Sequence, residues 1–285
     1  MKLIEWPTLG LFLATYVGWA VVVFAVPSLP VAIVLSGVLI AFHASLQHEA
    51  IHGHPFRSRF ANTLLAWPPL TLVIPYLRYR DTHLDHHCNC DLTDPFEDPE
   101  SNYCAAEQWN RRSVVCRAVL SFNNTLVGRI TVGPAIGTVS FLAAEMRTRH
   151  AIRGWLWHVP AMAAVLAVVL VSPMPLWAYL VACYIALALL RIRTFLEHQA
   201  HEFTRARSVI VEDRGPLAFL FLNNNLHAVH HAHPQVPWYR LPQLYRRNKA
   251  RFLKLNEGYA YRSYGEVFRR YLLRRKDPVV HPLKG

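Results

Sequence analysis

Two long stretches without charged side chains constrain what this chain can fold into. No Asp, Glu, Lys or Arg occurs from Trp6 to His48 or from Gly154 to Leu190. Each stretch is roughly twice the ~20 apolar residues that a membrane-spanning helix needs, and prolines interrupt each one near its middle. The pattern predicts an all-α integral membrane protein with two helical hairpins. Their four membrane-spanning helices are expected at about 8–25, 30–48, 155–172 and 175–195.

The charged residues lie almost entirely outside the hairpins, in 49–153 and 197–285. Cytoplasmic loops of membrane proteins carry an excess of Lys and Arg, so we predict that both segments and both termini are cytoplasmic. The net charge of +12 is typical of such loops, which anionic lipids attract, and it does not indicate nucleic-acid binding. The five cysteines are an odd number and lie on the reducing side or in a span, which argues against disulfide bonds. We expect one domain over residues 1–285.

Thirteen of the sixteen histidines fall into four clusters or lie beside them. Histidines three or four residues apart share one face of a helix, so their imidazoles can reach the same metal ion. Neutral imidazole is the commonest protein ligand for metals such as iron, zinc and copper. At least nine histidines have this spacing, more than one tetrahedral zinc needs, so we predict two metal ions bound almost entirely by imidazole. The clusters contain His48 and His52; His83, His86 and His87; His198 and His201; and His227, His230 and His231.

Polar residues near the clusters allow two interpretations each. The acidic loop 91–100 either orients imidazole N–H groups or caps turns beside its prolines. Asn224 or Asn225 either holds a metal-bound water or is a polar turn residue before a helix. His54 and His233 are expected to support the ligands or to lie on the surface. His281 stands apart from the clusters, and we expect its replacement by Ala to have no effect.

The sequences HEAIHG, HLDHH and HAVHH, in this order around paired hairpins, resemble the three histidine boxes of the membrane fatty acid desaturase and hydroxylase superfamily. Leu196-Glu197-His198 is similar to the fourth motif of the related alkane hydroxylases. The boxes lie at or just past the span ends on the predicted cytoplasmic side, so we expect a cytoplasmic cap that carries them. The resemblance extends from the second predicted span to Pro237. It also implies two ferrous ions held by His48, His52, His83, His86, His87, His198, His227, His230 and His231.

Two further histidines, His43 and His201, are alternative candidates for ligands. Some members of the superfamily have a first box of the form HxxxxH, which His43 and His48 also satisfy. We prefer His48 and His52 because His-Glu-x-x-His-Gly matches the form HDxxHG better. His201 lies one helical turn from His198 and can replace or support it.

The resemblance implies that dioxygen is reduced and a hydrogen is removed from an unactivated C–H bond of a lipid, with fatty acyl desaturation as the preferred outcome. The alternatives are a lipid hydroxylase or a carotenoid hydroxylase or ketolase of the same fold, and, more distantly, a metal-transporting membrane protein. No HPGG haem motif is present, so electrons are expected from a separate protein of the ferredoxin, rubredoxin or cytochrome b5 type. Basic residues either hold an acidic head group or anchor the chain at the interface; they include Arg78, Arg80, Arg191 and Arg193.

Overall fold

The computed structural model describes residues 4–88, 91–148 and 151–284. These residues are mostly helical with few strands, and four helices are long and apolar enough to cross a membrane, which confirms the predicted fold class. The chain divides into two compact units. Unit 1 comprises Met1–Asp81 and Pro134–Leu190, and unit 2 comprises Thr82–Gly133 and Arg191–Gly285.

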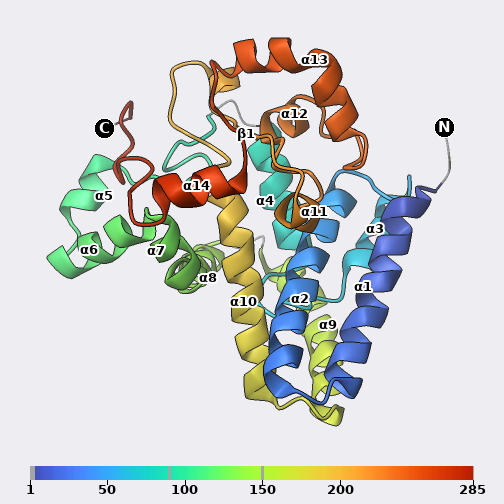
Figure 1. Cartoon of the computed structure of the whole chain (residues 1–285). Helices are drawn as coiled ribbons and strands as arrows, with labels where there is room; N and C mark the ends of the chain where they lie inside the picture. Colours follow the sequence, from blue (N-terminus) through green and yellow to red (C-terminus); the bar gives the residue numbers. More distant parts are fainter. Residues whose placement is uncertain (1–3, 89–90, 149–150, 285) are drawn as a thin grey trace. The chain divides into compact units, whose positions relative to one another are not determined.

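The four candidate membrane-spanning helices supply most of unit 1. They are α1 (Trp6–Ala25), α2 (Leu29–Ile51), α9 (Ala151–Val171) and α10 (Leu176–Thr194), of which the last four residues belong to unit 2. Each lies within four residues of its predicted bounds. Prolines begin α1 and α2, where a missing N–H costs nothing. The helices α1 and α2 pack side by side, and a short turn joins α9 to α10 (Figure 1).

The helices of unit 1 approach one another closely. Their side chains also provide hydrogen-bond partners for the backbone of an irregular loop. A Cβ on Gly37 of α2 would lie 2.7 Å from a methyl carbon of Ile185 on α10, so only glycine allows this spacing. Residues 67–75 connect α3 (Arg59–Ala66) to α4 (Tyr76–Cys88). Tyr179 donates a 2.8 Å hydrogen bond to the carbonyl oxygen of Leu70, and His158 Nε2 lies 3.0 Å from that of Leu72. Non-helical backbone among membrane helices needs such partners.

Unit 1 also contains a largely buried ion pair at the start of α4. Arg78 donates to Glu145, at the end of α8 (Gly133–Glu145), with a shortest N–O distance of 2.9 Å. Trp155 Nε1 donates a further bond of 3.0 Å to the same carboxylate. The guanidinium of Arg78 is thus engaged within the protein, which favours a structural role for it over head-group binding.

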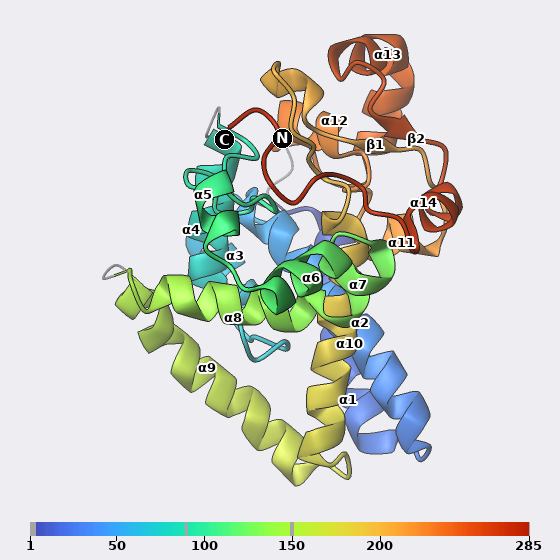
Figure 2. The ribbon, with the colours of Figure 1, turned by 90° about the vertical axis from the view of Figure 1, so that its left-hand side faces the viewer.

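Unit 2 is built from short helices around a two-stranded parallel sheet. Strand β1 (Ile210–Val211) pairs with β2 (Ala260–Tyr261), and Figure 2 shows both beside α14 (Tyr264–Tyr271). A buried apolar cluster joins β1 to α12 (His227–Ala232) and α13 (Leu241–Leu255). The other elements are α5 (Ala106–Asn110), α6 (Val114–Asn123), α7 (Leu126–Thr131), a 3-10 turn at Thr204–Ala206 and α11 (Pro216–Leu220).

A tight turn fixes where α12 begins. Leu222 and Asn223 both adopt left-handed backbone conformations, with φ of 49° and 57°. Asn tolerates this region, whereas Leu rarely adopts it. The Leu222 side chain is buried, so packing holds the strained turn in place. The described cysteines Cys88, Cys104, Cys116 and Cys183 are free thiols, and Cys90 lies outside the described residues.

Candidate metal centre

The two HxxHH motifs of unit 2 divide their histidines between two groups. On α4, His83 and His87 join one group while His86 joins the other. On α12, the pattern is reversed, because His230 joins the first group while His227 and His231 join the second. Residues i and i+4 lie above one another on a helix, and residue i+3 is rotated to one side. Each helix therefore contributes to both groups.

The second group contains four histidines, all from unit 2, whose ligand atoms lie within 4.8 Å of one another. His198, which follows the end of α10 by four residues, contacts two of the others. Its Nε2 atom is 3.0 Å from Nε2 of His86 and 3.1 Å from Nε2 of His227. His231 Nε2 is 3.1 Å from His227 Nε2. Four imidazole nitrogens thus converge on one point.

Partners on the opposite ring nitrogens orient two of the four rings in this group. His86 Nδ1 lies 2.7 Å from Oδ1 of Asp98, and His227 Nδ1 lies 3.0 Å from Oδ1 of Asn224. Both oxygens only accept, so each Nδ1 donates its proton and each Nε2 presents a lone pair. His198 Nδ1 has Ser208 Oγ at 3.3 Å. A metal cation among the four Nε2 atoms would accept a lone pair from each of them at once. The donor set therefore fits a metal ion.

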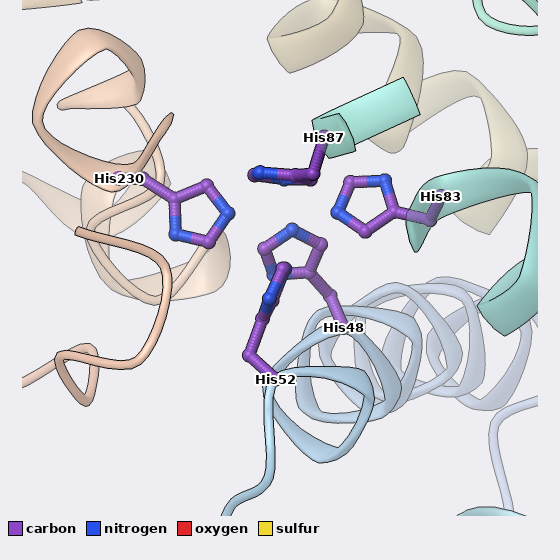
Figure 3. A group of neighbouring side chains, drawn as sticks. All are labelled: His48, His52, His83, His87 and His230. Atoms are coloured by element: carbon purple, nitrogen blue, oxygen red, sulfur yellow. The ribbon is translucent and has the colours of Figure 1, made fainter. Parts of the chain in front are cut away.

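The first group contains His83, His87 and His230 within unit 2. Figure 3 shows their rings turned toward one another, with His83 and His87 on α4 and His230 on α12. His83 Nδ1 lies 2.8 Å from Glu100 Oε1, so a carboxylate again holds the ring nitrogen that faces away. Figure 3 also labels two histidines of unit 1, His48 on α2 and His52 directly after its end, whose ring centroids are 4.8 Å apart.

The groups within unit 2 are direct neighbours. The rings of His87 and His231 stack with centroids 4.1 Å apart and an interplanar angle of 11°. The rings of His86 and His87 lie at nearly right angles, with centroids 5.9 Å apart. The arrangement therefore offers two adjacent imidazole sites.

Burial and carboxylates set the protonation of these rings. Burial alone would lower the pKa of His86, but the carboxylates of Glu100 and Asp98 raise that pKa to about 9. A carboxylate partner makes the imidazole more basic and strengthens it as a ligand. Burial lowers the pKa of His87 to about 3. Burial also lowers the pKa of three more histidines well below the usual value, namely His198, His227 and His231. The last four rings are neutral, the form that binds metals, whereas His86 would release a proton on binding a metal.

The other candidate histidines have different contacts. His43 is fully buried and its Nε2 lies 2.9 Å from the Tyr16 hydroxyl. His201 Nε2 lies 3.4 Å from a carboxylate oxygen of Glu257. Neither belongs to a group of convergent ligand atoms among the described residues. His54 Nδ1 is 2.8 Å from Glu5, and His233 is exposed.

The structure also decides between the two interpretations for several polar residues. In the acidic loop, Asp98 and Glu100 face imidazole nitrogens, whereas Asp94 accepts from the backbone N–H groups of Phe96 and Glu97 as a turn cap. Asn224 contacts His227. Asn225 instead donates to the carbonyl oxygens of Val211 and Asp213, in the role of a turn residue. Within each of these two segments, neighbouring polar residues therefore have different structural roles.

Sequence reasoning missed the residues that hold the backbone at His198. Lys276 Nζ donates a 2.6 Å bond to the carbonyl oxygen of His198 and lies 2.9 Å from Asp277 Oδ2. Tyr103 donates to the same carboxylate and accepts from the N–H of Ala200. Lys276 and Asp277 occur in a basic tail with no motif, so only the tertiary structure reveals this role.

Comparison with known proteins adds one finding. A family model described as fatty acid desaturase matches residues 18–264 of the chain. The match includes every histidine of both groups. No curated protein sequence matches the chain.

Proposed function

Since the chain belongs to the fatty acid desaturase family, we propose that it is a fatty acyl desaturase that uses dioxygen and two iron ions. The family is a class of lipid-oxidising enzymes, and the histidine groups fit a metal site. The observation that carries the proposal is the division of both HxxHH motifs between two adjacent imidazole groups. One metal ion would need only one such group.

We assign the ligands accordingly. The second group binds one ion through His86, His198, His227 and His231. The first binds the other through His83, His87 and His230. The resemblance of HEAIHG to the first histidine box adds His48 and His52 to this proposal. His43 and His201 are left out because Tyr16 and Glu257 are their respective partners.

Iron supplies the redox chemistry, in which dioxygen is reduced and a C–H bond is oxidised. The chain's own residues hold the ligands. Asp98 and Glu100 accept hydrogen bonds from Nδ1 of His86 and His83, respectively. Nε2 of each ring then faces its group. His83, His86, His227 and His230 are buried, which keeps bulk water away from the reacting atoms.

The substrate in this proposal is a lipid acyl chain, and the electrons come from a separate ferredoxin, rubredoxin or cytochrome b5 type protein. The four apolar helices support a membrane location. Segments 49–153 and 197–285, with both termini, are proposed to be cytoplasmic because they carry most of the Lys and Arg. We treat the chain as one functional domain, because α4 and α10 each continue from unit 1 into unit 2.

Metal analysis and lipid profiling test the proposal together. Protein purified in detergent should contain about two irons per chain and consume dioxygen with a reductant. Membranes of expressing cells should gain a double bond in their acyl chains, and the His86→Ala variant should not produce it. A new hydroxyl group or an altered carotenoid would instead identify the reaction as hydroxylation or ketolation. Zinc alone without dioxygen consumption, or metal uptake into vesicles, would contradict the oxygenase proposal and favour transport.

A further inference from the structure

Unit 2 contains a second candidate site, a cavity of about 250 Å³ that no histidine of the two groups lines. Its charged lining consists of four cations and two carboxylates, so its formal charge is 4 − 2 = +2. These six residues are Arg214, Arg246, Lys249, Arg262, Glu212 and Asp213. A cavity with this charge favours an anion.

Both carboxylates are already engaged by the protein. Glu212 Oε1 lies 2.5 Å from Lys249 Nζ and accepts a 2.5 Å bond from the Tyr245 hydroxyl. Burial alone would raise the pKa of Glu212, but Lys249 and Tyr245 lower it, so the carboxylate is ionised. Asp213 accepts from the backbone N–H groups of Gly215 and Tyr264. Both acids are thus held in place, and the four cations of the lining exceed them by two positive charges.

The three arginines come from separate elements that the small sheet brings together. Arg214 follows β1, Arg262 follows β2, and Arg246 lies on α13. Val211 pairs with Tyr261 in the sheet, so the chain leaves both strands in the same direction. All three side chains are exposed, and none of their guanidinium groups forms an ion pair with another described residue. Their charge is available for a ligand.

We propose that this cavity binds a ligand that carries a phosphate group with two negative charges. A guanidinium presents a planar fork of donors that matches phosphate oxygens in a bidentate manner. The volume is just below the usual range for small-molecule pockets, which suits a phosphate head group better than a whole lipid. A soluble phosphate compound and a lipid phosphate share this chemistry.

The site lies against the segment that orients a candidate metal ligand. Asn223 and Leu226 line the cavity, and Asn224 between them contacts His227. Asn225 is tied by hydrogen bonds to Val211 and Asp213, the latter at the cavity. A bound phosphate would therefore brace the turn before α12. The site itself does not depend on which reaction the histidine groups perform.

Calorimetric titration of the full chain in neutral detergent tests the proposal. Inorganic phosphate and dihexanoyl phosphatidic acid serve as probes, and acetate serves as the control anion. We expect phosphate to bind and acetate not to bind. Arg246→Gln and Arg262→Gln should each weaken binding about tenfold, because each removes a charge-assisted contact. Arg247→Gln is the matched control, because Arg247 is an exposed neighbour on α13 outside the cavity.

The same titrations separate the possible outcomes. Tighter binding of the phosphatidic acid identifies a lipid phosphate, and equal or tighter binding of inorganic phosphate identifies a soluble compound; both support the site. Binding should persist in the double variant His86→Ala/His230→Ala, which removes one ligand from each group, because phosphate at a metal ion would be lost with the metal. No binding of either probe, equal weakening by Arg247→Gln, or loss of binding in His86→Ala/His230→Ala would overturn the proposal. None of these results depends on catalytic activity.

Discussion

The Nδ1 atom of His86 lies 2.7 Å from Oδ1 of Asp98, and both side chains are buried. The same carboxylate accepts backbone N–H groups from Thr93 and Glu100. The two carboxylate oxygens of Asp98 therefore accept hydrogen bonds from three donors. It fixes His86 in the tautomer whose Nε2 faces the other imidazoles, and it anchors the acidic loop to α4.

Asp98→Asn should weaken metal binding by the second group about 10- to 100-fold, the range measured for such partners elsewhere. The amide keeps the volume but replaces one acceptor oxygen with an N–H donor, so one of the three donors loses its partner. Metal retained during competition with a chelator measures the effect. Glu97→Gln is the control, because Glu97 is exposed on the same loop. Equal retention in both variants would show that Asp98 does not support a metal ligand.

His230→Ala and His227→Ala should each remove roughly half of the bound metal, because the two histidines belong to different groups. The double variant should retain almost none. Both single variants should lose dioxygen consumption, because the proposed reaction needs both ions. Metal analysis of monodisperse protein in detergent gives the ratio. His233→Ala is the matched control, since His233 is exposed directly after α12. Full metal content in His230→Ala would refute our ligand assignment.

The division of the histidines shows what the sequence could predict. The four spans follow from uncharged intervals and proline breaks, which act locally, so their bounds were predicted closely. Helical spacing also placed His83, His86 and His87 near one another. It could not show that His86 faces a different group from the other two. That depends on how α4 is rotated against α12, and hence on packing between segments far apart in sequence.

Lys276→Met should destabilise the backbone around His198. Methionine has a similar length but leaves the carbonyl of His198 and the carboxylate of Asp277 without the ammonium, at a cost of about 1–3 kcal/mol. We expect a lower melting temperature and reduced metal retention. Adding Asp277→Asn should recover part of the stability, because no partly buried carboxylate is then left unpaired. Arg274→Gln, exposed in the same tail, should change neither quantity.

His281 illustrates a limit of the sequence analysis, which expected its replacement to have no effect. A lone histidine near the end of a basic tail carries no pattern. The structure buries it, and its Nδ1 accepts the backbone N–H groups of Leu283 and Lys284. Its Nε2 lies 3.2 Å from Thr93 Oγ1, and Thr93 donates to Asp98. His281 is thus linked through two residues to His86, and we now expect a stability effect.

The stability that His281 provides should be lost as the pH falls. Burial, followed by the charge of Arg207, lowers its pKa below the usual value of 6.5. Below about pH 6.5 the unfolded chain binds a proton that the folded chain does not, so the free energy of unfolding decreases. Protonation at Nδ1 would also break the two bonds to the backbone. His281→Gln does not titrate, so its melting temperature should fall less than that of the wild type between about pH 7.5 and about pH 5.5. Parallel melting curves would show that His281 is not held neutral by the fold.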